Sequence, residues 1–118
     1  MTMPAHADIR YELTLGGQAF EAVGFLAAGE ESVRGEEAIR RCDNGHLIRS
    51  EDDWHLLYKH RSQLPQGLVA YWLVTARPNP GYPRDVSSLD FDSLEWYDRW
   101  NDLDNRWDRD SLVVRRRM

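Results

Sequence analysis

The sequence predicts an α+β fold: a mostly antiparallel sheet of about five or six strands, with two short helices between strands two and three. Residues 67–76 form the longest uncharged run and are rich in β-branched and aromatic residues, which is typical of a central strand. Alternating apolar and polar residues before Gly16 and Gly17 indicate a hairpin, and two segments between it and the uncharged run carry helix-capping signals. We expect all 118 residues to form a single domain with loose ends at 1–7 and 116–118.

The first predicted element is a hairpin with strands over residues 8–15 and 18–25. Glycine readily adopts the positive φ angles that a two-residue hairpin loop requires, so Gly16 and Gly17 suit the turn. This loop would place Leu15 opposite Gln18 and Leu13 opposite Phe20. A slip of one residue would move the apolar side chains to the other face of the sheet, so we expect this register.

Two helices are predicted next, over residues 33–43 and 51–61. Ser32 can cap the first helix. Ser50 is followed three residues later by the carboxylate of Asp53, and apolar residues follow at helical spacing. The second helix therefore has the stronger sequence signal.

The predicted central strand, residues 67–76, is apolar on both faces and needs cover on both. Trp72 lies in the middle of this run, so we expect it in the core. Three prolines fall within residues 77–84, which predicts an extended loop without regular structure. A strand is predicted over 86–91, followed by a turn at 92–93.

The pattern from Leu94 onward is compatible with two structures. Trp96, Trp100, Leu103 and Trp107 fall at helical spacing, but the intervening Asp and Asn residues are poor helix formers. We favour strands, with a break near 102–105 and a final strand at 112–115, because the exposed sheet needs more edge partners.

Composition limits the classes of function. The formal net charge is −5, and residues 85–110 contain nine acidic and three basic residues, a net charge of −6 for this segment. That segment would attract a basic partner and repel a nucleic acid. The single cysteine, the absence of a secretory signal pattern and the absence of a long apolar run predict a cytoplasmic protein that does not enter a membrane.

No catalytic, cofactor-binding or metal-binding residue is predicted. Cys42, His46, His55 and His60 do not have a recognised zinc spacing, and no nucleophile motif surrounds Ser50 or Cys42. We therefore expect a protein that is not an enzyme. The alternative is a small enzyme or small-ligand-binding domain that uses the Pro-rich loop 77–84 and the helix carrying His55.

The candidate partner-binding face is the acidic, tryptophan-rich C-terminal third. Exposed aromatic side chains rimmed by charge are typical of protein interfaces, so we expect an accessory or inhibitor protein with a basic partner. The same tryptophans could instead close the open face of the sheet. The candidate residues are Trp96, Asp98, Arg99, Trp100, Asp102, Asp104, Arg106, Trp107 and Asp108.

The two ends of the chain carry one resemblance. Residues 94–107 and 112–116, with the opening Tyr11-Glu-Leu-Thr-Leu-Gly-Gly17, resemble small hypothetical proteins of bacterial genomes. This resemblance implies no activity, so it assigns no site residue.

Overall fold

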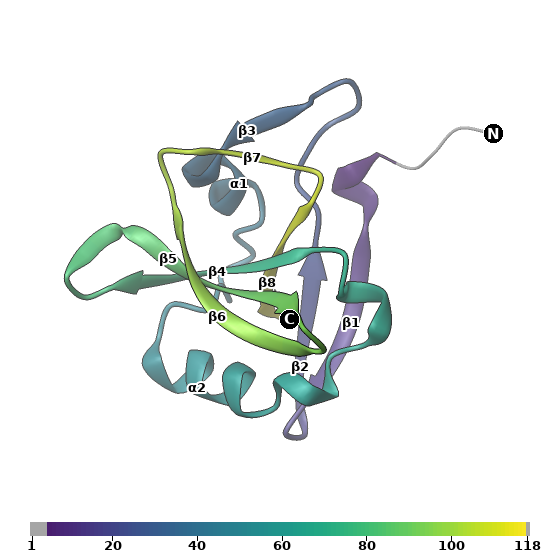
Figure 1. Cartoon of the computed structure of the whole chain (residues 1–118). Coiled ribbons are helices and arrows are strands. Elements are labelled where there is room, and N and C mark those ends of the chain that lie inside the picture. The colour runs from purple at the N-terminus through teal and green to yellow at the C-terminus, as the bar shows by residue number, and fades with distance from the viewer. Residues whose placement is uncertain (1–4, 118) are drawn as a thin grey trace.

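The computed structural model describes residues 5–117 and contains a six-stranded sheet with the strand order β1-β2-β8-β4-β5-β6 (Figure 1). Residues 1–4 and 118, part of the predicted loose ends, lie outside the described residues. The strands of the sheet are β1 (Arg10–Leu15), β2 (Gln18–Val23), β4 (Trp72–Asn79), β5 (Tyr82–Asp92), β6 (Glu95–Asp102) and β8 (Ser111–Arg116).

The other elements lie above and below this sheet. A short two-stranded ribbon of β3 (Ser32–Arg34) and β7 (Arg106–Asp108) lies beside helix α1 (Gly35–Arg41) (Figure 1). Helix α2 (Glu51–Lys59) packs on the opposite face. The 3₁₀ turns are η1 (His6–Asp8), η2 (Arg61–Gln63) and η3 (Gln66–Leu68).

Each face of the sheet has its own hydrophobic core, as expected for central strands that are apolar on both faces. The core under α2 contains Leu57, Leu73 and Leu112, and the core under α1 contains Ala38 and Val113. Neighbouring residues of one strand thus point into different cores. Trp72, which we expected in the core, is only partly buried and packs at the margin of the α1 side.

The sheet is mixed, which corrects our prediction of a mostly antiparallel sheet. Strands β4 and β8 run parallel, with Trp72 beside Ser111 and Val74 beside Val113. Strand β8 therefore lies between β2 and β4, although it comes last in the chain. No local sequence signal marks a pairing between segments so far apart.

The predicted position of the helices is also wrong, because a third strand precedes them. Ser32 begins β3 and pairs with Asp108 of β7, so it does not cap α1; Arg34 occupies that position. Both helices are shorter than predicted. The cap of α2 is as expected, since the Ser50 hydroxyl accepts a hydrogen bond from the Asp53 amide at 3.1 Å.

The first hairpin is confirmed. Gly16 and Gly17 have φ angles of +57° and +78°, and Leu15 pairs with Gln18 and Leu13 with Phe20. The chain follows the predicted turn because glycine adopts these angles without steric cost.

The central strand lies further along the chain than predicted. Residues 67–71 are outside any strand, and β4 runs from Trp72 to Asn79. Residues 77–84 belong to the β4–β5 hairpin rather than to an irregular loop. Proline has no amide proton to donate to a neighbouring strand. Strand β8 pairs with β4 only from Trp72 to Val74, so Pro78 lies beyond that pairing and no donor to β8 is needed there.

The C-terminal third forms strands, as we favoured. Ser93 and Leu94, one residue later than predicted, make the turn between β5 and β6 with φ angles of +49° and +70°. After β6 the chain forms β7 of the two-stranded ribbon and then re-enters the sheet as β8 (Figure 1).

Both predicted loose ends are anchored within the described residues. His6 is buried beneath the end of β2, and Arg116 pairs with Phe20 in the sheet. The Arg116 guanidinium also binds the Asp53 carboxylate of α2 at 2.6 Å. None of the helices in residues 5–117 is both long and apolar enough to span a membrane.

Candidate functional site

The three tryptophans of the predicted interface point to different parts of the molecule. Trp96 is buried in the core under α2, where its ring lies 5.3 Å from that of Phe91. Trp107 is buried in the core under α1. Only Trp100 is exposed, with 46% of its surface accessible. The nine candidate residues therefore do not form one continuous surface.

Five of these nine residues do meet around one open hollow of about 310 Å³, which we call the acidic hollow. It lies where the end of β6, the start of β8 and strand β7 approach the start of β4. Sequence analysis missed half of its lining. The residues around it are Trp72, Trp100, Asn101, Asp102, Asn105, Arg106, Trp107, Asp108, Asp110 and Ser111.

Two side-chain turns shape the hollow. The Asp102 Oδ1 accepts the Asp104 amide at 2.8 Å, and the Asp108 Oδ1 accepts the Asp110 amide at 2.9 Å. Such bonds from Asp to the amide two residues later stabilise tight turns. They reverse the chain at both ends of β7, and the Asp110 carbonyl then accepts the Trp72 amide at 2.7 Å.

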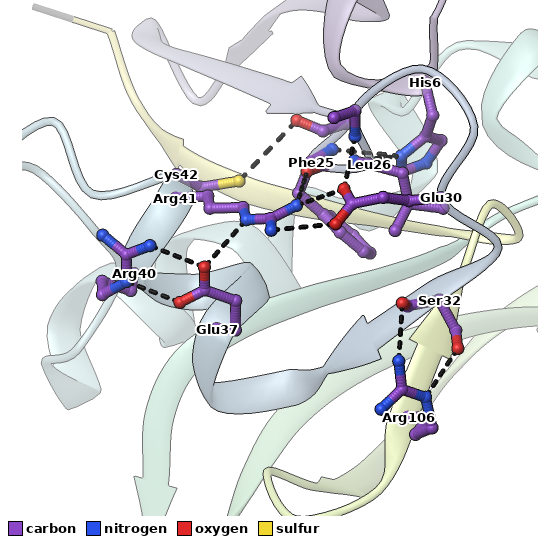
Figure 2. A network of polar contacts seen from close by, with 12 residues as sticks. His6, Phe25, Leu26, Glu30, Ser32, Glu37, Arg40, Arg41, Cys42 and Arg106 are labelled. Atoms are coloured by element: carbon purple, nitrogen blue, oxygen red, sulfur yellow. Dashed lines mark hydrogen bonds and ion pairs between the residues drawn. The ribbon is translucent and has the colours of Figure 1, made fainter.

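The acidic hollow has an excess of negative charge. Its carboxylates are those of Asp102, Asp108 and Asp110, and none forms an ion pair with a cation in residues 5–117. Its one guanidinium, Arg106, is held by Ser32: Nε donates to Oγ at 2.7 Å and Nη2 to the carbonyl at 2.8 Å (Figure 2). The carboxylates are therefore available to an external cation.

Asp104 has a structural role outside the acidic hollow. It binds the guanidinium groups of Arg34, at 2.7 Å, and Arg84, which also pairs with Glu36 of α1. The hydrogen bond from Arg84 holds the pKa of the Asp104 carboxyl below its ordinary value. This network joins the β6–β7 turn to the β4–β5 hairpin.

Asp98 and Arg99 lie on β6, beyond the acidic hollow. Both are exposed, and the Arg99 guanidinium lies 5.4 Å from the centre of the Tyr97 ring. Asp98 has no ion pair within the described residues. These two residues belong to the outer strand of the sheet, not to the hollow.

Trp100 already lies beside a cation. The Arg77 guanidinium is 5.4 Å from its ring and 5.7 Å from that of Trp54, while two of its nitrogens bind the Glu51 carboxylate. An indole face attracts a cation through its quadrupole, typically by about 0.5–1 kcal/mol at an exposed site. Trp100 thus already has one cation of the protein beside its ring, although 46% of its surface is accessible.

The structure separates the two parts of the alternative site, the helix carrying His55 and residues 77–84. His55 is exposed on α2 and lines a different hollow, beside Gly16 and Arg116. None of residues 77–84 lines that hollow. Arg77 joins the two regions through its contacts with Glu51 and Trp54 of α2.

The other reactive side chains have structural roles. Cys42 is buried, and burial raises the pKa of its thiol to about 11. In residues 5–117 no group of three or more His, Cys, Asp and Glu side chains could hold a metal ion.

His6 is the histidine with the clearest role. Its Nδ1 accepts the amides of Phe25, at 3.0 Å, and Leu26, at 3.1 Å (Figure 2). Its Nε2 donates to the Ser111 carbonyl at 2.9 Å. This pattern requires the neutral ring with its proton on Nε2. Burial lowers the pKa of His6 from its ordinary value of 6.5, outweighing the opposite effect of the Ser111 carbonyl.

We therefore expect the free energy of unfolding to fall as the pH drops below about 6.5, because the unfolded chain then binds a proton that folded His6 does not. Denaturant titrations from about pH 7 to about pH 5 measure this dependence. In His6→Asn the dependence should be weaker, whereas His55→Asn should match the parent. Equal dependence in parent and His6→Asn would contradict the role given to His6.

Comparisons with known proteins add no relative: no family model matches the chain, and neither a curated protein nor a solved structure matches it. The resemblance to small bacterial proteins stays a prediction.

Proposed function

We propose that the protein is a non-catalytic, cytoplasmic binding protein that recognises a basic partner protein by taking one of its lysine or arginine side chains into the acidic hollow. One observation carries this proposal: three indole rings and three carboxylates without ion pairs in the described residues surround one open hollow. A volume of about 310 Å³ lies at the lower end of the range for ligand sites, which suits a single side chain.

The chemistry of the lining supports a cationic occupant. The carboxylates of Asp102, Asp108 and Asp110 supply negative charge, and Trp72 and Trp100 supply apolar surface for the methylene groups of a long side chain. The contact between Arg77 and Trp100 illustrates how an indole face holds a guanidinium. A nucleic acid would be repelled by the same carboxylates.

The proposal is tested with three peptides that differ in one central side chain: acetyl-Gly-Arg-Gly-amide and its lysine and norleucine analogues. Tryptophan fluorescence follows the titration, because Trp72 and Trp100 line the acidic hollow. We expect the arginine and lysine peptides to bind and the neutral norleucine peptide not to bind. Rising salt should weaken binding, since exposed charges are screened.

Asp108→Asn should weaken binding about two- to fivefold at low salt, the range for one exposed ion pair. Asparagine keeps the Oδ1 acceptor for the Asp110 amide, so the turn should persist. The matched control is Asp92→Asn, which removes an exposed carboxylate outside the acidic hollow. Equal affinity of the three peptides, or equal effects of the two substitutions, would contradict the proposed function.

A further inference from the structure

Strand β6 is an outer strand of the sheet: within residues 5–117 it pairs only with β5 (Figure 1). An outer strand presents a row of backbone amides and carbonyls that can pair with another chain. Strand β6 runs from Glu95 to Asp102, which is long enough to template an added strand.

The register shows which backbone groups of β6 face outward. Ser93 and Leu94 form a two-residue loop, so Asp92 and Glu95 make a hydrogen-bonded pair and every second residue after Glu95 bonds to β5. The bond from the Leu103 amide to the Arg84 carbonyl, at 2.8 Å, continues this alternation. The backbone groups of Trp96, Asp98, Trp100 and Asp102 therefore point away from the sheet.

The carbonyl groups at the two ends of this row already accept hydrogen bonds from side chains of the protein itself. The Arg61 Nε donates to the Trp96 carbonyl at 3.1 Å, and the Trp107 Nε1 donates to the Asp102 carbonyl at 3.2 Å. Between them, the exposed Arg99 side chain reaches the Asp98 carbonyl at 3.2 Å. The amides of Asp98 and Trp100 remain available to an added strand.

The charge along this edge selects the kind of strand that can pair with it. Glu95, Asp98 and Asp102 give β6 three carboxylates against the single guanidinium of Arg99. A second copy of β6 would bring like charges together, which is destabilising across a strand pair. A segment rich in lysine or arginine would instead be attracted.

We propose that an extended basic segment of the partner protein adds to β6 as a seventh strand and places one of its cationic side chains in the acidic hollow. Trp100 and Asp102 connect the two features, because both carry outward backbone groups and both line the hollow. The inference rests on the proposed function and adds the conformation of the partner. Main-chain hydrogen bonds would supply affinity, and the acidic hollow would supply specificity.

The test uses a short capped peptide in which lysine and threonine alternate. Hydrogen exchange followed by NMR should show that the peptide protects the amides of Asp98 and Trp100, while that of Arg99, already bonded to β5, changes little. Asp98→Pro removes one outward amide and should weaken binding about fivefold more than Asp98→Asn, which removes only the charge. Melting curves check that both variants fold. N-methylation of the peptide amides tests the reciprocal bonds in the unaltered protein, because it removes the peptide donors that would bond to outward carbonyls of β6 such as that of Trp100.

The outcomes separate the two proposals. Peptide binding that depends on Asp108, without protection of the Asp98 and Trp100 amides and with no effect of N-methylation, would overturn the added strand but leave the proposed function. Protection of these amides without any dependence on Asp108 would contradict the acidic hollow. No binding of the peptide to the parent protein would overturn both.

Discussion

Trp107→Ala should lower the free energy of unfolding by about 3–5 kcal/mol, the usual cost of truncating a buried large aromatic side chain. Only 4% of Trp107 is exposed. Its ring packs so closely on Gly35 that a Cβ there would lie 2.5 Å from ring atoms. Its Nε1 also donates to the Asp102 carbonyl. Loss of this side chain would remove the packing between β7 and Gly35, the first residue of α1.

Urea unfolding measures this effect, and Trp100→Ala is the matched control. Trp100 is half exposed, and its main identified contact is with Arg77, so we expect a loss of about 1 kcal/mol. Because Trp107 supports the fold, a binding defect in Trp107→Ala would say nothing about the acidic hollow. If the two substitutions destabilised the protein equally, the packing role of Trp107 would be wrong.

Arg115→Met should lower the free energy of unfolding by about 3 kcal/mol, since it removes the principal partner of a buried carboxylate. Glu21 is 2% exposed and receives two hydrogen bonds from Arg115, from Nε at 3.2 Å and Nη2 at 2.9 Å. The same guanidinium donates to the Cys42 carbonyl at 2.6 Å. Arg115 thus joins β2, β8 and the end of α1.

Arg10 provides the control, because it binds the other oxygen of Glu21 at 2.8 Å but has a side chain that is 57% exposed. Arg10→Met should cost at most about 1 kcal/mol. Adding Glu21→Gln to Arg115→Met should recover part of the loss, because the buried charge is then gone. Equal losses of stability in Arg10→Met and Arg115→Met would contradict the expectation that the more buried guanidinium contributes more to the stability of the fold.

The elements that sequence predicted well are those with local signals. Gly16 and Gly17 supply the φ angles of the first turn, and Ser50 caps α2 through Asp53. The strands after Leu94 were favoured on a different ground: the exposed sheet needs further edge strands, and local composition counted only against a helix. What sequence missed depends on distant segments: β3 forms because Val33 meets Trp107, and the parallel pairing exists because Trp72 meets Ser111.

The residues of the candidate site were likewise predicted only where the signal was local. An excess of carboxylates and indoles drew attention to the correct third of the chain, which supplies most of the acidic hollow. Helical and strand patterns could not show that Trp96 and Trp107 enter opposite cores. Trp72 was missed because only the long-range pairing of β4 with β8 brings it to the hollow. Asp110 lay in the acidic segment, but only the turn at Asp108 gives its position.

The position of β8 also has a consequence for folding. Hairpin β1-β2 and strands β4-β5-β6 share no direct strand pairing, so β8 alone joins them in the sheet. During synthesis, the two parts cannot join into one sheet before residues 111–116 are available, and until then β2 and β4 each keep an unpaired edge. A fragment ending at residue 110 would therefore leave an open slot, which a synthetic peptide of the missing residues could fill to restore the sheet.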